Sequence, residues 1–532
     1  MTESAVPASI LGSLKIRSKL LIVLVFVAVT SAGIYAIIEY RAAKQALLEQ
    51  SFSSLTAVRE MKSQQIEDYF AFISNQIVSL SESQTIVEAM RNFEAATYLL
   101  DTSRGNSVST LLQSYYEREF LPRLGQNSLA EDLRRSQDYL PRDVTARVLQ
   151  DRYIAANSNS TGEKHLLDDA GDGSQYSSVH RKYHPYIRSF LERFGYYDIF
   201  LIDAETGRIV YSVFKEVDFG TSLLTGPYAD TNFAEAFRAA REASSSDFVW
   251  FEDFAPYAPS YNAPASFVAS PIFDDNEVTG VLVFQMPIDR INDIMTSQRA
   301  WSEVGLGYSG ETYIVGEDLL MRNQSRFLIE DREGYLQAIR ESGLDESIIK
   351  KITTFNTSID LQPVDTIGTR AALAGETNTE IFPDYRGVEV LSAYRPLNLP
   401  GLSWVIMSEI DEAEALLPAH RLRNRTLILM GVLTLGVIFI SFMFARTMTR
   451  PIQNLTDKAK KIAQGDLGLT IEASGGDEIA QLARNFDAMR EALREMVEGL
   501  EEKVAERTKD LSDSETRVRA MSYARIWVIA EI

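Results

Sequence analysis

Aromatic and charged residues suited to a small-molecule site are grouped in one part of the chain. Such sites combine flat apolar rings, which exclude water, with a few ionic groups that orient a polar solute. The alternative interpretation is that the rings pack in an ordinary core and that the lysine lies at the exposed end of a strand. The candidate ligand-binding residues are Tyr211, Lys215, Trp250, Asp253 and Tyr257.

Two other motifs have the spacing of metal sites. His180 and His184 stand four residues apart near Glu192, so two imidazoles could share one helix face. Their proline and aromatic neighbours favour histidines that only pack. Residues 168–179 have the length of a calcium loop, but Val179 stands where the last ligand, a glutamate, is required, which favours a solvated loop. We therefore predict no metal and no cofactor.

Signatures of catalysis are missing from the sequence. The chain has no cysteine, which excludes thiolate nucleophiles, disulfides and cysteine-based metal sites. It has no P-loop, no His-Glu-x-x-His and no Gly-x-Ser-x-Gly motif. Gly475–Glu478 matches the start of the diguanylate cyclase signature, but the residues that follow are too few and too helical for a cyclase domain. We predict that this chain has no catalytic residues and is not itself an enzyme.

Two apolar segments are long enough to cross a bilayer. Residues 20–38 and 426–445 carry no charge, and as helices each spans roughly 30 Å. Basic residues before the first segment and after the second place both termini in the cytoplasm, although three arginines before the second weaken this orientation. A cleaved signal peptide is the alternative for the first segment, whose apolar stretch is long for one. The prediction is a multi-pass protein of the inner (plasma) membrane, in contact with lipid.

The region between the two segments is acidic. The chain has a net charge of −21, and because the two ends beyond the region sum to +2 and −2, the region itself carries −21. An acidic surface repels nucleic acid, so nucleic acid is not a predicted partner.

This outer region shows a long helix followed by two similar sets of strands. Apolar residues from 41 to about 100 keep mostly three-and-four spacing, which predicts an amphipathic helix. Tyr196–Val213 is a hairpin pattern, and a comparable strand and turn begin at Gly310. Strand pairs that start at Ser266 and Val390 complete each set. The pattern predicts two α/β modules in tandem, each an antiparallel sheet with helices on one face, or else a coincidence of ordinary hairpins.

At these residues the chain resembles the double Cache family of extracellular sensors. The resemblance covers about residues 41–417 and is carried by the stretches FGYYDIFLIDAETGRIVYSVFKEVDFGTSL and GYSGETYIVGEDLLMRNQSR. It implies a long helix that carries two PAS-like modules. It also implies that a small solute binds over the sheet of the membrane-distal module.

Beyond the second apolar segment, two helical patterns flank a Gly-rich connector. Each pattern has one narrow apolar seam, so two chains would bring four seams together in a parallel four-helix bundle, which predicts a homodimer. The stretch resembles the HAMP linker, and the next residues resemble a signalling-helix coiled coil. The residues that this resemblance assigns to signal relay are Pro451, at the first helical turn, and Gly465, Asp466, Leu467, Glu478, Ile479, Leu482, Phe486 and Met489.

These observations predict an α+β membrane receptor that binds a small extracytoplasmic solute and relays the event to a cytoplasmic effector. The alternative is the sensor part of an enzyme, a histidine kinase, a nucleotide cyclase or a serine phosphatase, whose catalytic domain lies outside this chain. A chemotaxis transducer is a third option, for which the helical sequence after the linker is short. The predicted domains are a cytoplasmic N-terminus (1–19), a first span (20–38), a sensor (39–425, with parts 41–190, 191–300 and 301–417), a second span (426–445), a HAMP linker (446–499) and a signalling coiled coil (500–532), where the output domain is missing.

Overall fold

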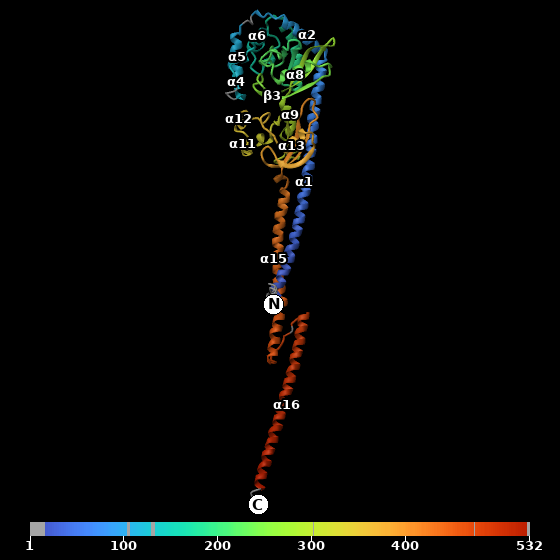
Figure 1. The fold of residues 1–532 in the computed structure, drawn as a ribbon, viewed down its shortest axis with the longest axis vertical. Helices are drawn as coiled ribbons and strands as arrows, with labels where there is room; N and C mark the ends of the chain where they lie inside the picture. The colour runs from blue at the N-terminus through green and yellow to red at the C-terminus, as the bar shows by residue number, and fades with distance from the viewer. Residues whose placement is uncertain (1–15, 104–106, 129–132, 302, 473, 529–532) are drawn as a thin grey trace, which may run out of the picture. The chain divides into compact units, whose positions relative to one another are not determined.

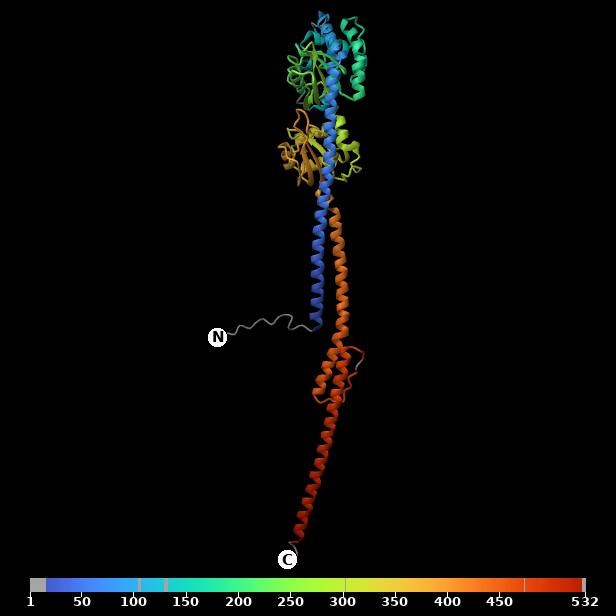
Figure 2. The ribbon, with the colours of Figure 1, turned by 90° about the vertical axis from the view of Figure 1, so that its right-hand side faces the viewer.

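The computed structural model describes residues 16–103, 107–128, 133–301, 303–472 and 474–528. Residues 1–15 of the predicted cytoplasmic N-terminus and the last residues of the predicted coiled coil, 529–532, lie outside the described residues. The chain divides into two compact units, Lys44–Pro418 and the segments Met1–Ala43 with Ala419–Ile532. Figures 1 and 2 show the elements of both units.

The helices are α1 (Ile16–Ser81), α2 (Gln84–Tyr98), α3 (Thr110–Tyr115), η2 (Tyr116–Phe120), α4 (Leu121–Leu124), η3 (Gly125–Asn127), α5 (Ser136–Tyr139), α6 (Val144–Gln150), η5 (Asp151–Ala155), η6 (Lys164–Leu166), α7 (Gln175–Phe194), α8 (Asn232–Arg241), α9 (Ile288–Thr296), η7 (Ser297–Arg299), α10 (Arg326–Glu330), α11 (Arg332–Glu341), α12 (Glu346–Phe355), α13 (Ile367–Leu373), α14 (Glu412–Ala415), α15 (Leu417–Ala463) and α16 (Glu478–Val528). The strands are β1 (Asp198–Asp203), β2 (Ile209–Ser212), β3 (Trp250–Tyr257), β4 (Ala263–Asp274), β5 (Glu277–Gln285), β6 (Glu311–Val315), β7 (Asn378–Pro383), β8 (Glu389–Pro396) and β9 (Val405–Asp411).

The unit Lys44–Pro418 contains two antiparallel sheets. The first has the order β2-β1-β5-β4-β3 and the second the order β6-β9-β8-β7. The two orders match strand for strand if β2 is left out, with β1 equivalent to β6 and β5 to β9. The first residues of β1 and β6 are also equivalent. Asp198, the first residue of β1, pairs with Gln285 of β5, and Glu311, the first residue of β6, pairs with Glu409 of β9. We call the parts around these sheets the distal module (β1 to β5) and the proximal module (β6 to β9).

Helices cover both faces of the distal sheet, which corrects the prediction of helices on one face. The ring of Phe200 on β1 lies 4.6 Å from that of Phe233 on α8. Phe284 on β5 faces the other way, since it pairs with the neighbouring residue of β1, and its ring lies 5.9 Å from that of Phe190 on α7. Every residue of β1 is buried as a result. Strands buried on both faces are apolar without alternation, so their sequence does not show how many faces are covered.

Helix α1 runs alongside both modules (Figure 2). Its apolar side chains Ile66, Phe70, Ile73, Ile77 and Leu80 are buried in the core of the distal module. Leu55 and Val58, about two to three turns before Ile66, pack against Leu391 and Ala393 of the proximal sheet. The predicted amphipathic helix therefore serves as a common support, while Met61, which shares its spacing, is exposed.

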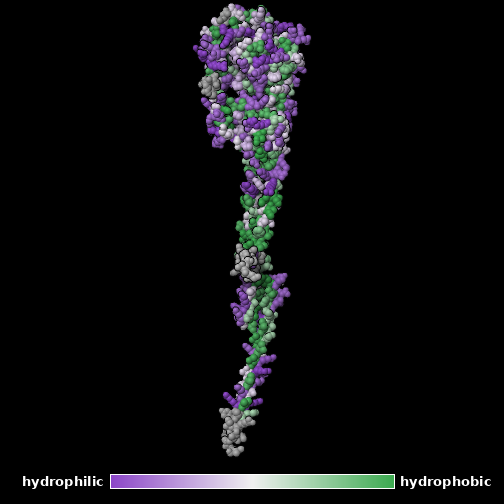
Figure 3. Space-filling model, viewed as in Figure 1, coloured by the Kyte–Doolittle hydropathy of each residue, from purple (hydrophilic) through white to green (hydrophobic). Residues whose placement is uncertain are grey.

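Two helices, α1 and α15, are long and apolar enough to cross a membrane. Hydrophobic side chains gather on the visible face of their apolar stretches, whereas the sensor surface is mixed (Figure 3). α15 continues without a break through Pro451, which corrects the prediction that this proline starts a helix. A proline inside a helix removes one backbone hydrogen bond, a cost of about 3 kcal/mol that the helix on both sides must offset.

The connector between α15 and α16 begins at a left-handed glycine. Gly465 has a φ of 95°, and its N–H donates to the carbonyl of Ile462 at 3.0 Å, which ends α15. At the other end, Asp477 accepts a hydrogen bond from the N–H of Ala480 at 2.9 Å and caps α16. Ile471 of the connector is buried between the two helices, together with Leu455. The connector thus returns along the helix pair.

We expect Phe70→Ala to destabilise the sensor strongly, because Phe70 is fully buried and its ring contacts Phe251 at 5.0 Å and Trp404 at 5.5 Å. The loss in unfolding free energy should be about 3–5 kcal/mol, measured by urea unfolding of residues 44–418. Phe72→Ala on the exposed face of the same helix is the matched control and should cost less than about 1 kcal/mol. Equal losses in the two variants would contradict this role of α1.

Candidate functional site

A buried lysine lies just after β2 in the distal module. Lys215 is 2% exposed, and its φ of 60° is unusual for a residue with a side chain. Its ammonium donates to the carbonyl of Ser212 and lies 4.5 Å from the ring centroid of Tyr211. Burial lowers the pKa of Lys215 to about 7, because removal from water disfavours the charged form.

Three buried or partly buried carboxyl groups belong to the same region, and the charge of one of them, Asp198, acts on Lys215. Asp198 accepts hydrogen bonds from the N–H groups of Ile199 at 2.7 Å and Val213 at 2.8 Å. Asp218 accepts from the hydroxyl of Tyr257 at 2.7 Å. Burial raises the pKa of Asp198 to about 7 and that of Asp218 to about 6.

The third carboxyl group, Glu216, is partly buried and accepts from the hydroxyl of Ser260 at 2.8 Å, which itself accepts from Gln285 at 3.1 Å. Burial and the nearby Asp218 raise its pKa. We call Asp198, Lys215, Glu216, Asp218, Tyr228, Tyr257 and Gln285 the distal polar cluster.

Several atoms of the distal polar cluster lack partners. Within the part of the chain that the structure describes, Asp198 Oδ2, Asp218 Oδ1, Gln285 Oε1 and the hydroxyl of Tyr228 are buried and make no hydrogen bond. Each such group costs about 1–3 kcal/mol. Three of them are acceptors, so the cluster is complementary to a small molecule that carries several N–H or O–H donors.

Three of the five candidate ligand residues meet in this region. Tyr211 and Lys215 are in contact, and Tyr257 is bonded to Asp218. Trp250 does not join them, since it is 36% exposed at the beginning of β3 and donates to Glu252 at 2.8 Å.

Asp253 does not join them either. It accepts from the guanidinium of Arg322 at 2.9 and 2.8 Å and from the indole N–H of Trp404 at 2.9 Å, both in the proximal module. The pairing of β3 with β4 shifts between Glu252 and Ala255, and such a bulge re-aims the side chain within it.

The site residues that the sequence did not single out are mostly acidic or amide side chains. Asp198, Asp218 and Gln285 are buried. In the sequence, Asp198 and Gln285 stand at the ends of apolar strands. This pattern does not reveal that the two side chains are buried, because exposed strand ends show it as well.

The histidines pack in the core instead of forming a metal site. The rings of His180 and His184 stack at 4.3 Å, and His184 bonds the hydroxyl of Tyr211 and the carbonyl of His165 through its two nitrogens, at 2.7 and 2.6 Å. Asp172, in the stretch that resembles a calcium loop, forms an ion pair with Arg152 at 2.7 Å. Among the described residues, no group of three or more His, Asp and Glu side chains is placed to hold a metal ion.

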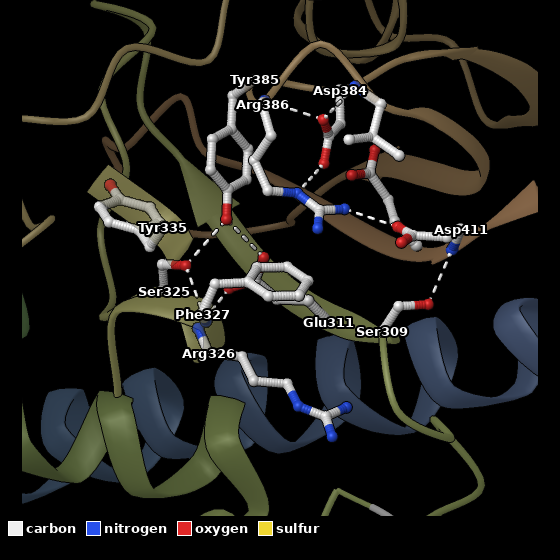
Figure 4. Close-up of polar contacts among 12 residues, drawn as sticks. Ser309, Glu311, Ser325, Arg326, Phe327, Tyr335, Asp384, Tyr385, Arg386 and Asp411 are labelled. Carbon is white, nitrogen blue, oxygen red and sulfur yellow. Dashed lines mark hydrogen bonds and ion pairs between the residues drawn. The ribbon is translucent and has the colours of Figure 1, made fainter. Parts of the chain in front are cut away.

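The proximal module has a polar cluster at the equivalent position of its sheet (Figure 4). Glu311 accepts from the hydroxyl of Tyr385 at 2.7 Å and from the N–H of Arg326 at 2.5 Å. Arg386 lies between Asp384 and Asp411, each at 2.6 Å.

Glu409 belongs to the same proximal cluster. One of its oxygens accepts from the hydroxyl of Tyr313 at 2.8 Å, and the other is buried without a hydrogen bond among the described residues. Burial and the nearby Asp384 raise the pKa of Glu409 to about 8.

The residues that the sequence predicts for signal relay lie in and around the helix pair after the apolar stretch of α15. Leu467, Ile479 and Phe486 are partly buried against its small core. Leu482 and Met489 are exposed on α16. Asp466 follows Gly465 in the connector, and Glu478 is the first residue of α16.

Two family models match the sequence. The model of the Cache domain matches residues 39–419, and the model of the HAMP domain matches residues 443–495. The matched families are a sensor domain and a HAMP domain, and neither is a catalytic domain.

Curated relatives are similar over short stretches. The chain is 30% identical over 95 residues to the methyl-accepting chemotaxis protein McpC of Bacillus subtilis (strain 168), which is 18% of this chain and 14% of McpC. It is 31% identical over 106 residues to the alginate biosynthesis sensor protein KinB of Pseudomonas aeruginosa, which is 19% of this chain and 17% of KinB. The chain therefore spans less than a fifth of these two relatives.

Solved structures with similarity include the sensor domain of the V. cholerae histidine kinase DctB, at 14% identity over 56% of this chain and 97% of that chain, with a TM-score of 0.28. The ligand-binding domain of the Pseudomonas aeruginosa PAO1 amino acid chemoreceptor PctC, in complex with GABA, is 13% identical over 47% of this chain and 87% of that chain, with a TM-score of 0.26.

We expect the stability of the sensor to fall as pH rises from about 5 to 8, and Glu409→Gln to reduce this slope. The folded state holds the Glu409 proton up to about pH 8, whereas the unfolded chain releases it near 4.5. Unfolding therefore releases a proton in this window, which contributes a slope of at most about 1.4 kcal/mol per pH unit. Urea unfolding at a series of pH values measures the slope, with the exposed Glu389→Gln as control. A slope that is the same in wild type and Glu409→Gln would contradict the assignment.

Proposed function

The chain belongs to the Cache domain family, and from this premise we propose that it is a homodimeric receptor of the plasma membrane that binds a small polar solute in its distal module. The solute would occupy the distal polar cluster. The bound state would be relayed through α15 and the HAMP domain to a cytoplasmic effector.

The unpaired buried atoms of the distal polar cluster are the observation that carries this proposal. Asp198, Asp218 and Gln285 each present an acceptor without a donor among the described residues, within a module that has a large core of buried apolar side chains. A solute with amine, amide or hydroxyl donors would satisfy these acceptors and recover the cost of their burial. Lys215 would then be the donor for an acceptor group on the same solute.

The proposed topology uses the two apolar segments as membrane spans. Residues 20–38 and 426–445 would cross the lipid, the sensor (39–425) would lie outside the membrane, and both termini would be cytoplasmic. The HAMP linker would extend over 446–499 and a coiled coil would follow from residue 500. The basic residues on the cytoplasmic flanks, among them Arg446 and Arg450, support this orientation.

Exposed apolar side chains on the HAMP helices support a dimer. The apolar seams of the two helices include Ile452 on α15 and Leu482 and Met489 on α16, which are 42%, 45% and 47% exposed in the single chain. A second copy would bury these side chains in a four-helix bundle, with about 25 cal/mol gained for each Å² of apolar surface removed from water.

Signal relay requires that the solute favour one of two arrangements of the dimer. A difference of about 1–3 kcal/mol in binding free energy shifts the equilibrium about 5- to 150-fold. The alternative function is the sensor part of an enzyme such as a histidine kinase. The similarity to KinB, named a sensor protein, supports this alternative, and the similarity to McpC supports a chemotaxis-type receptor.

We expect Lys215→Met to weaken solute binding at least about tenfold, which corresponds to about 1.4 kcal/mol, because the variant removes the one cation of the cluster. A thermal-shift screen of small amines, amides, polyols and hydroxy acids first identifies a solute that raises the unfolding temperature. Its affinity is then measured by calorimetry for wild type, Lys215→Met and the exposed control Lys350→Met. A solute that binds all three proteins equally would place the site elsewhere.

We expect Phe486→Asp to uncouple the HAMP domain from the sensor, because the side chain is partly buried in the small core of the helix pair. The affinity for the solute found above should stay within about twofold of wild type, since the sensor is untouched. A spin label on a cysteine introduced at the exposed Glu498, in a chain that has no other cysteine, reports the helix arrangement with and without solute.

The matched control for this relay experiment is Asn485→Asp, which places the same charge on the neighbouring exposed residue. This control should keep the solute-dependent change of the label distance, and Phe486→Asp should lose it. A wild-type response in Phe486→Asp would refute the relay through this core.

A further inference from the structure

A cavity of about 400 Å³ lies between the distal and proximal modules, and no residue of the distal polar cluster is among those that line it. Pro256 and Pro264 contribute to it from the distal module, and Phe355 and Ile359 from the proximal module. Small-molecule sites have volumes of about 300–1,000 Å³ and mostly apolar walls with a few polar groups. The cavity has the size and the wall chemistry of such a site.

Ionic groups of both signs line the same cavity. Lys351 lies on α12, Asp289 on α9, and Asp360 in the segment between α12 and α13. Within the described ranges, the ammonium of Lys351 and the carboxylate of Asp289 have neither an ion pair nor a hydrogen bond. One oxygen of Asp360 faces Arg322 at 3.4 Å, and its second oxygen makes no hydrogen bond there. The cavity wall thus presents one cationic and two anionic side chains, which could pair with charged groups of a bound solute.

The cavity is connected to the contact that joins the modules. Arg322 is 2% exposed, and its guanidinium binds Asp253 of the distal module as well as Asp360 and Asp318 of the proximal module. Burial raises the pKa of Asp360 to about 6, in spite of the nearby Arg322, so this carboxyl is incompletely compensated by its partner. A cationic group in the cavity would share Asp360 with Arg322 and would change how Arg322 holds Asp253.

We propose that this inter-module cavity is a second solute site, which takes a small zwitterion with an ammonium and a carboxylate at the two ends of a short apolar chain. The ammonium binds Asp360 and Asp289, the carboxylate binds Lys351, and the chain lies against Phe355 and the proline rings. The ionic residues stand on different elements, so a molecule with separated charges matches them better than one with a single charge. Occupancy acts on the contact between the modules through Arg322.

The experiment measures binding to the full chain in lipid nanodiscs by calorimetry. The probes are the zwitterions δ-aminovalerate and β-alanine and the singly charged analogues valerate and pentylammonium. At least one zwitterion should bind at millimolar concentration or below, and about tenfold more tightly than either analogue. Lys351→Met should lower the affinity for the zwitterion to that for pentylammonium and leave pentylammonium unchanged. Asp360→Asn should weaken both.

Two control variants separate this site from the distal one and from general effects of charge. Lys350→Met removes the neighbouring exposed lysine of α12 and should leave every affinity unchanged. The loss of zwitterion affinity caused by Lys351→Met should be the same in a Lys215→Met background, which distinguishes failure of this site from failure of the proposed distal site. Equal affinities for all four probes, loss of zwitterion binding in Lys215→Met instead of Lys351→Met, or no binding of any probe would each overturn the proposal.

Discussion

Helix α1 is shared by the two modules of the sensor, and burial of its apolar stripe is the interaction on which their arrangement depends. Ile66 to Leu80 belong to the distal core, and Leu55 and Val58 to the contact with the proximal sheet. Each fully buried side chain of this kind contributes about 1.5–3 kcal/mol. Apolar contacts alone would tolerate a shift of the helix, but Arg59 and Lys62 are also buried and have specific partners. Arg59 donates to the carbonyl of Tyr394 at 3.1 Å, and Lys62 donates to Ser297 at 2.6 Å. A shift would leave these charges buried and unpaired, so they fix the position of α1 along both modules.

The two polar clusters occupy one register of the sheets but differ in how well their atoms are paired. In the proximal module, Glu311 has both oxygens in hydrogen bonds and Arg386 neutralises Asp384 and Asp411, while Glu409 keeps one unpaired oxygen among the described residues. In the distal module, Asp198 and Gln285 each keep an unpaired acceptor. A satisfied network stabilises one arrangement, whereas an unsatisfied one has free energy to gain from a partner. The larger number of unpaired atoms in the distal cluster supports the proposal that the solute binds there.

The sequence predicted the parts of this structure that depend on local pattern. The apolar segments, the amphipathic α1, the hairpins and the HAMP motif all follow from periodicity or from short motifs, and the resemblance to double Cache sensors is confirmed by the family match. Features that depend on distant residues were not predictable. Burial of Asp198 and Asp218 results from closure of the module around them, and the placement of Asp253 results from a bulge. The sequence predicted that a helix starts at Pro451, whereas α15 continues from its apolar stretch through this residue.

Strand β3 connects the distal polar cluster to the contact between the modules. Tyr257, at one end of β3, donates to Asp218 in the cluster. Asp253, four residues earlier in the bulge, holds Arg322 of the proximal module. Asn232 of α8 donates to the carbonyl of Asp253 at 2.9 Å and to that of Ala265 at 2.7 Å, and so compensates backbone groups near the bulge. A solute that pulled Asp218 away from Tyr257 would act on the strand that also carries Asp253. The bulge leaves the ladder locally unpaired at Asp253, so a displacement of β3 would act on the ion pair with Arg322.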